Sequence, residues 1–173
     1  MCYNPSQHCG GFFMSYVKWP CKLLEETPGE FGLIADELLP DYVRRDGFGY
    51  SRQSGIIRSE MEAGYPKTRR RFTATIRNYR VSFTLTSLQF TTFEDFVYNT
   101  QTATDPPGII GGVMPFTFPD PIWKPQEGQS ENDRPTMVVR MVAPTGSDLY
   151  SVAPDQTNDD WIVAFQLERL PGL

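Results

Sequence analysis

The sequence predicts a mainly β fold with a single helix, in the α+β class. Large apolar side chains occupy every second position over residues 79–86 and again over residues 161–168, and a period of two is typical of half-buried strands. Between these stretches, at residues 87–98, apolar side chains recur at spacings of three and four, which indicates a helix. The side chains expected to form its buried face are Phe90, Phe93, Phe96 and Val97.

A hairpin is expected immediately before the helix. Residues 68–76 are rich in β-forming side chains. Arg77-Asn78 is a plausible tight turn between them and residues 79–86, although it lacks the glycine of the commonest hairpin turns. Ser87 is expected to cap the helix. The predicted unit is therefore strand, turn, strand and helix.

The rest of the chain predicts shorter elements. Residues 113–118 and 136–143 are short apolar stretches and are expected to form strands. Residues 45–55 contain three glycines and are expected to form a loop. Residues 12–28 are interrupted by two prolines, so an extended segment or an edge strand is expected there.

Length and composition predict one globular domain. A chain of 173 residues can bury a substantial core. It contains no apolar run of about 18 residues, the length that spans a membrane. The N-terminus lacks the charged and apolar regions of a signal peptide. The protein is therefore expected to be made in a cytoplasm and to have no membrane span.

Three cysteines, Cys2, Cys9 and Cys21, lie near the N-terminus. An odd number suits reduced thiols better than a set of disulfides. With His8, the only histidine, they could supply four zinc ligands. No two cysteines have the short spacing of a zinc-binding pair, however. No metal or other cofactor is therefore expected.

Charge is distributed unevenly along the chain. Residues 57–80 contain seven Lys or Arg and two Glu, a net charge of +5, so the other residues carry −10 because the total is −5. An acidic chain lacks the general field that attracts nucleic acid, and sequence-specific nucleic-acid binding is not expected. One interpretation of the basic block is a solvated face. The other is contact with an acidic patch on a neighbouring copy, made by Arg69, Arg70 and Arg71.

Acidic residues gather in an expected loop over residues 146–160, which includes Asp155, Asp159 and Asp160. Paired carboxylates can serve acid–base catalysis or bind a metal, but no histidine lies near them in the sequence. No serine or cysteine has the surroundings of a catalytic nucleophile. The sequence thus predicts a protein that is not an enzyme. The three aspartates are candidates for the acidic side of a subunit interface.

Several motifs, taken in order, resemble a known family. They are IIRSEMEAGYPKTRRRF at residues 56–72, MPFTFPDP at residues 114–121 and WIVAFQLERLP at residues 161–171. Together they resemble the minor tail proteins of long-tailed bacteriophages, the family that includes the lambda minor tail protein M and is related in fold to distal tail proteins. The resemblance covers residues 46–173, which are expected to form one β domain. Residues 1–45 look like an N-terminal extension, which could act as an inter-subunit arm.

The resemblance implies a tail-tube-like β-sandwich or barrel with the helix packed on it and an extended N-terminal segment. It also implies a structural virion protein that forms a ring, of six copies, at the distal end of the tail. The ring would join the tail tube to the tail tip or baseplate hub. The implied partners are further copies of the chain, the tail tube protein, the tip or hub proteins and the tape measure protein.

Two alternative functions remain open. The same fold serves tail-tube and tail-terminator or completion subunits, at other positions of the tail. A carbohydrate-binding module is the alternative from a different class, with Trp19 and Trp123 as exposed aromatic platforms beside loops. Fold alone does not decide among these functions.

Overall fold

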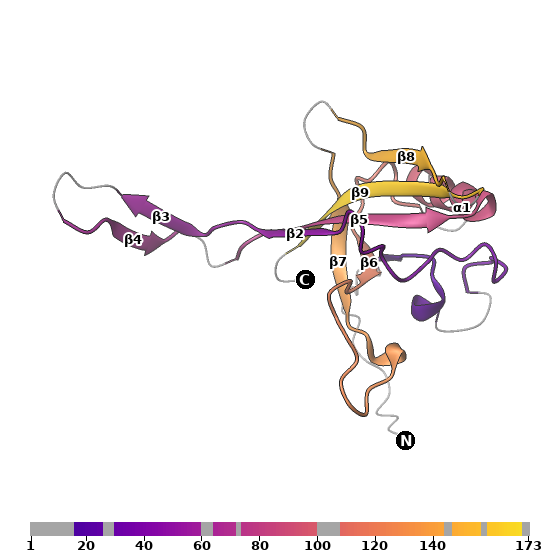
Figure 1. Cartoon of the computed structure of the whole chain (residues 1–173), viewed down its shortest axis with the longest axis horizontal. Helices are drawn as coiled ribbons and strands as arrows, with labels where there is room; N and C mark the ends of the chain where they lie inside the picture. The colour runs from indigo at the N-terminus through magenta and orange to yellow at the C-terminus, as the bar shows by residue number, and fades with distance from the viewer. Residues whose placement is uncertain are drawn as a thin grey trace, which may run out of the picture.

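The structure is a computed structural model that describes residues 16–25, 30–59, 64–71, 74–99, 108–143, 147–156 and 159–170 (Figure 1). In this part of the chain there is one α-helix, α1 (Ser87–Tyr98). The prediction of a mainly β fold with a single helix is confirmed. The strands are β1 (Val17–Lys18), β2 (Gly49–Arg52), β3 (Ile56–Ser59), β4 (Lys67–Arg70), β5 (Arg77–Leu85), β6 (Phe116–Pro119), β7 (Thr136–Met141), β8 (Tyr150–Pro154) and β9 (Trp161–Arg169), and two 3-10 turns are η1 (Lys22–Leu24) and η2 (Glu131–Asp133).

Strand β9 is the centre of a seven-stranded sheet with the order β1-β6-β7-β9-β5-β2. All nine residues of β5 pair with one edge of β9. The other edge is shared, because β8 pairs with Trp161–Phe165 and β7 with Leu167–Arg169. Figure 1 shows β6 and β7 running across the direction of β5 and β9, so the sheet curls around the core. A separate two-stranded sheet joins β3 and β4.

Trp19 lies at the centre of the core and is fully buried. Its indole contacts six aromatic rings, which belong to Phe83, Phe93, Phe96, Phe116, Phe118 and Phe165. Strand β1 places it there by pairing in parallel with the edge of β6, so the edge strand expected in residues 12–28 is present. The expectation that Trp19 is an exposed platform is wrong, because its neighbours on both sides are core rings.

Residues before the expected boundary at position 45 contribute to the same core. Val17, Trp19, Cys21, Leu24 and Leu39 are buried in one cluster with residues of β5, β6, β7 and β9. Burial of large apolar side chains stabilises a fold by about 1.5–3 kcal/mol each. The described part of residues 1–45 therefore belongs to the folded domain, and the boundary does not separate two cores. Residues 1–15 lie outside the described part of the chain.

Helix α1 forms where its period predicted and buries the expected face. Phe93 and Val97 are fully buried, Phe96 is 7% exposed, and the half-buried Phe90 packs against the core. The cap is Thr86 and not Ser87. Thr86 Oγ1 accepts from the N–H of Gln89 at 3.3 Å, and Gln89 Oε1 accepts from the N–H of Thr86 at 3.2 Å. This capping box fixes the turn between β5 and the helix.

The prediction of a hairpin turn at Arg77-Asn78 is wrong. Both residues lie inside β5, where they pair with β2 on one side and β9 on the other. A residue that pairs on both edges belongs to a central strand and cannot also reverse the chain. The reversal instead lies between Ser59 and Lys67, where Gly64 has φ of +98°, a conformation that glycine adopts readily. Strand β2 lies within the loop expected over residues 45–55.

A strand also lies within the acidic segment expected to be a loop over residues 146–160. Strand β8 covers Tyr150–Pro154 and pairs with the first half of β9. Its side chains are mostly exposed, so it lacks the apolar alternation by which the buried strands were predicted.

Candidate interaction surfaces

The hairpin between β2 and β5 continues far beyond the sheet. We call residues 53–76 the hairpin arm; the structure describes 53–59, 64–71 and 74–76 of it. Figure 1 shows it projecting from the end of β2 and β5. In β3 and β4 seven of eight residues are exposed, and Ile57 is half-buried. None of the described arm residues belongs to the buried core.

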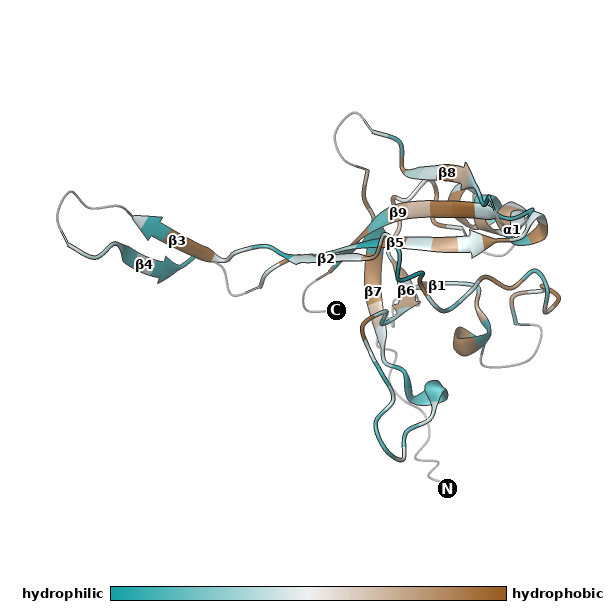
Figure 2. Ribbon diagram, in the orientation of Figure 1, coloured by the Kyte–Doolittle hydropathy of each residue, from teal (hydrophilic) through white to brown (hydrophobic). Residues whose placement is uncertain are grey.

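Basic side chains lie on both faces of the β3–β4 ladder. Opposite residues of an antiparallel pair share a face, and successive residues alternate between faces. The register pairs Ile57 with Arg69 and Ser59 with Lys67 on one face, and Arg58 with Thr68 and Ile56 with Arg70 on the other. Each face thus carries two cations, and the described arm residues include no Asp or Glu. Figure 2 shows β4 among the most hydrophilic parts of the molecule. The block of charge is visible in the sequence, but its division between two faces follows only from the register.

The two ladders of the hairpin are separated by an irregular segment, which we call the elbow. On one strand it contains residues 53–55 and on the other residues 71–76, of which the structure describes 71 and 74–76. Backbone bonds close it at both ends, from Gln53 N to Ile76 O at 3.0 Å and from Arg71 N to Gly55 O at 2.7 Å.

The elbow contains an open pocket of about 450 Å³. Three arginines, Arg52, Arg69 and Arg70, are among the residues that line it, and no described acidic residue is. Arg52 is oriented by a bond of 2.8 Å from its Nε to Thr75 Oγ1. Within the described residues neither Arg52 nor Arg69 forms an ion pair. The pocket can therefore accept an anionic group from another molecule.

The candidate acids lie at the opposite end of the sheet. We call residues 155–160 the acidic turn; it connects β8 to β9 and is closed by a bond of 2.8 Å from Asp155 N to Asp160 O. Asp159 is exposed and Asp160 is half-buried. Asp155 is 3.5 Å from Arg44 Nη1, which also donates to Thr84 Oγ1 at 2.8 Å. Asp155 thus serves an ion pair within its own chain.

The register of β5 and β9 separates the basic and acidic candidates. The hairpin arm leaves the sheet where Arg77 pairs with Arg169, whereas the acidic turn enters it where Leu85 pairs with Trp161. At about 3.4 Å per residue these ends are roughly 27 Å apart. The structure therefore does not bring Arg69, Arg70 and Arg71 together with Asp155, Asp159 and Asp160 within one copy.

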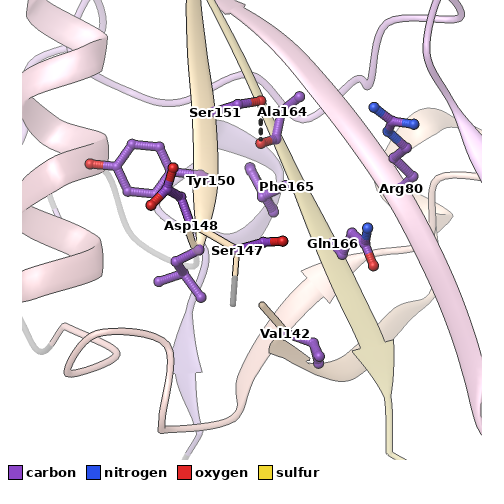
Figure 3. Close-up of a pocket in the computed structure, with 10 residues that line it drawn as sticks. Arg80, Val142, Ser147, Asp148, Tyr150, Ser151, Ala164, Phe165 and Gln166 are labelled. Atoms are coloured by element: carbon purple, nitrogen blue, oxygen red, sulfur yellow. Dashed lines mark hydrogen bonds between the residues drawn. The ribbon is translucent and has the colours of Figure 1, made fainter. Parts of the chain in front are cut away.

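A second pocket, of about 290 Å³, lies where β7 and β8 meet along β9 (Figure 3). Figure 3 shows Arg80 and Gln166 on one side and Asp148 on the other. Tyr150 turns toward α1, where its hydroxyl donates to Glu94 at 3.1 Å. Burial, followed by hydrogen bonding with Tyr98 and with Glu94, raises the pKa of the Tyr150 phenol above its usual value. None of the described residues that line it is a histidine or a cysteine.

Trp123 is half-buried and lines a groove of about 420 Å³ with Tyr42 and Arg134. The Arg134 guanidinium lies over the Tyr42 ring, 4.5 Å from its centroid, and Arg134 Nη1 donates to the carbonyl oxygen of Asp41 at 2.9 Å. One face of Tyr42 is therefore already covered. Of the two tryptophans expected as stacking platforms, only Trp123 reaches the surface.

Cys21 is fully buried in the core, and burial raises the pKa of its thiol to about 11. Cys2, His8 and Cys9 lie outside the described residues. Among the residues that the structure describes, no three His, Cys, Asp or Glu side chains are grouped closely enough to hold a metal ion.

No helix in the described part of the chain has both the length and the apolar character needed to cross a membrane. Comparisons with protein-family models, with curated proteins and with solved structures found no match to this chain. The resemblance to minor tail proteins therefore stays a prediction from the sequence.

Proposed function

We propose that this chain is a structural, non-enzymatic virion protein of a long-tailed bacteriophage. It forms a ring at the distal end of the tail, where it joins the tail tube to the tip or baseplate hub. The order of the sequence motifs supports the family, and the mainly β fold is compatible with it. The single observation that carries assembly is the hairpin arm, whose β3–β4 ladder is exposed on both faces.

An arm of this kind is suited to a partner because little in its own chain stabilises it. An isolated two-stranded hairpin is marginally stable in water, and unpaired strand edges favour contact with another chain. Large apolar side chains of the arm are also exposed, Ile56 by 62% and Tyr65 by 96%. Burial against a neighbouring subunit would remove this apolar surface from water.

The placement of charge favours a head-to-tail contact between copies. A surface at one end of the subunit that binds a different surface at the other end generates a ring when the rotation closes. Opposite charges at the two ends, the basic hairpin arm and the acidic turn, would orient the subunits. The other partners would be the tail tube protein, the tip or hub proteins and the tape measure protein.

Removal of the hairpin arm tests this proposal. Gln53 and Ile76 are already bonded across the hairpin, so replacing residues 54–75 with Asn-Gly would close a two-residue turn at that point. The shortened protein should unfold cooperatively like the wild type, because no core residue is removed. It should fail to enter phage tails.

The position of the protein along the tail is determined by electron microscopy with gold-labelled antibody on purified particles that carry the wild-type protein. Label at the distal tail end is the expected result. Label along the whole tail would identify a tube subunit, and label next to the head would identify a terminator subunit. Absence from the particles would reject a structural role in the virion. Normal incorporation of the shortened protein would reject the role of the hairpin arm in assembly.

A further inference from the structure

We infer that the elbow pocket is a carboxylate-binding site and that it receives the acidic turn of a second copy of this chain. The inference rests on the proposed function, to which it adds the contact that joins neighbouring subunits. Its participants are Arg52 and Arg69 on one copy and Asp159 and Asp160 on the other.

The composition of the pocket selects an anionic group. Three arginines are among the residues that line about 450 Å³ of open space, and none of the described lining residues is acidic. The bond from Arg52 Nε to Thr75 Oγ1 holds one guanidinium in place, which leaves its terminal N–H groups to donate elsewhere. Planar guanidinium groups bind carboxylates through paired hydrogen bonds, and an oriented arginine loses less freedom when it does so.

Carboxylates and nucleic-acid phosphates are both anions that arginines bind. Charge balance favours the carboxylate. The chain has a net charge of −5, and this overall field opposes the approach of a polyanion. A protein loop brings few charges and would be repelled less.

The acidic turn is a suitable occupant from the chain itself. Asp159 is exposed and Asp160 is half-buried, and the bond from Asp155 N to Asp160 O joins the two ends of the turn. Its own chain cannot deliver it to the elbow, because the turn and the hairpin arm leave opposite ends of β5 and β9. The contact therefore has to form between copies, and it repeats from each copy to the next.

Reciprocal charge reversal tests this contact in the full-length protein. One variant carries Arg52→Glu with Arg69→Glu, and the other carries Asp159→Lys with Asp160→Lys. Light scattering at low and high salt gives the mass of each. The wild type should associate at low salt and dissociate at high salt, since salt screens exposed charges. Each variant alone should remain monomeric.

An equimolar mixture of the two variants should associate again. In the mixture, the acidic elbow of the arginine variant can bind the basic turn of the aspartate variant. The native elbow of the aspartate variant can likewise bind the native turn of the arginine variant. The matched control is Arg45→Glu with Lys124→Glu, two exposed cations outside the hairpin arm that form no ion pair within the described residues. The control lowers the net charge by the same amount as the elbow variant and should associate like the wild type.

A mixture that stays monomeric overturns the inference, as does a wild type that stays monomeric at high concentration. Loss of association in the control as well would also overturn it, because net charge and not the elbow would then be the cause. Duplex DNA binding that is lost only in the elbow variant would assign the pocket to phosphate. These outcomes leave the proposed function standing if the protein is still found at the distal tail end, so the two can fail separately.

Discussion

The indole Nε1 of Trp19 donates a hydrogen bond of 3.0 Å to the carbonyl oxygen of Pro40. Beside it, the backbone N–H of Leu39 donates to the carbonyl oxygen of Pro20 at 2.8 Å. These bonds join the start and the end of the segment that precedes β2. The buried indole is thereby satisfied, as a buried polar group has to be, and the N-terminal segment is fixed to the centre of the core.

Replacing Trp19 should destabilise the protein strongly. Trp19→Ala should lower the free energy of unfolding by roughly 3–5 kcal/mol, because it leaves a cavity among six rings. Trp19→Phe should cost less, about 1–3 kcal/mol, since it fills part of the space but leaves the carbonyl of Pro40 without its donor. Urea unfolding measures both. Trp123→Ala is the control and should change stability little, so equal losses at the two tryptophans would contradict this packing.

The helix cap gives a second prediction, which separates two adjacent residues. Thr86→Ala removes the oxygen that accepts from the N–H of Gln89 and should cost about 1 kcal/mol of stability. Ser87→Ala should change little, because the first helical residue has no capping role here. Chemical unfolding of the two variants compares them directly. A larger loss at Ser87 would mean that the helix begins one residue later.

The parts of the fold that could be predicted from sequence are those with a long amphipathic period. β5 buries the side chains predicted from its alternation, and β9 buries Val163, Phe165 and Leu167 but leaves Trp161 38% exposed. The helix shows the same agreement between period and burial. β1 and β8 could not be found in this way, because one has two residues and the other is mostly exposed. Neither leaves a periodic pattern in the sequence.

The elbow could not be predicted because it depends on register. The basic block was visible in the sequence, and it led to Arg69, Arg70 and Arg71. Arg52 was missed, since it lay in a segment expected to be a loop. Its place beside Thr75 and Arg69 follows only once β2 is paired with β5 and β3 with β4. The topology of the sheet, and not the local sequence, likewise places the hairpin arm and the acidic turn at opposite ends of β5 and β9.

The end of α1 gives a third prediction. The chain returns across the helix terminus, where Ile109 N donates to Phe96 O at 2.8 Å and Gly111 N donates to Val97 O at 2.6 Å. These bonds satisfy carbonyls that a helix end leaves without intrahelical partners. A Cβ on Gly108 would lie 2.5 Å from Asn99 O and 2.9 Å from Phe96 O. Gly108 is therefore required by close backbone approach.

Gly108→Ala should lower the free energy of unfolding by about 1–3 kcal/mol, because backbone atoms have to move to make room. Gly49→Ala is the matched control, since its Cβ would meet only the Arg80 side chain at an ordinary 3.4 Å. Thermal unfolding of both variants is the measurement. Equal stability of the two would show that the return segment moves without cost.

The fourth prediction concerns alkaline pH and Cys21. Burial, the largest cause, raises the pKa of this thiol from 9.0 to about 11. The folded protein thus holds the proton more tightly than the unfolded chain between these values. The stability that depends on the protonated thiol is fully present below pH 9 and is lost as the pH rises toward 11. The difference between the two pKa values corresponds to roughly 2–3 kcal/mol.

Urea unfolding of the wild type and of Cys21→Ala from neutral pH to pH 11 isolates this contribution. Cys21→Ala should be less stable at neutral pH because it removes buried volume, but its stability should fall less steeply above pH 9. Tyr150 remains in both proteins, and its raised pKa contributes equally to the two curves, so the difference in slope belongs to Cys21. The thiol should also react with alkylating reagents only when the protein opens, because the thiolate is the reactive form. Parallel pH curves, or rapid labelling of Cys21 in the folded protein, would mean that the thiol is accessible to water.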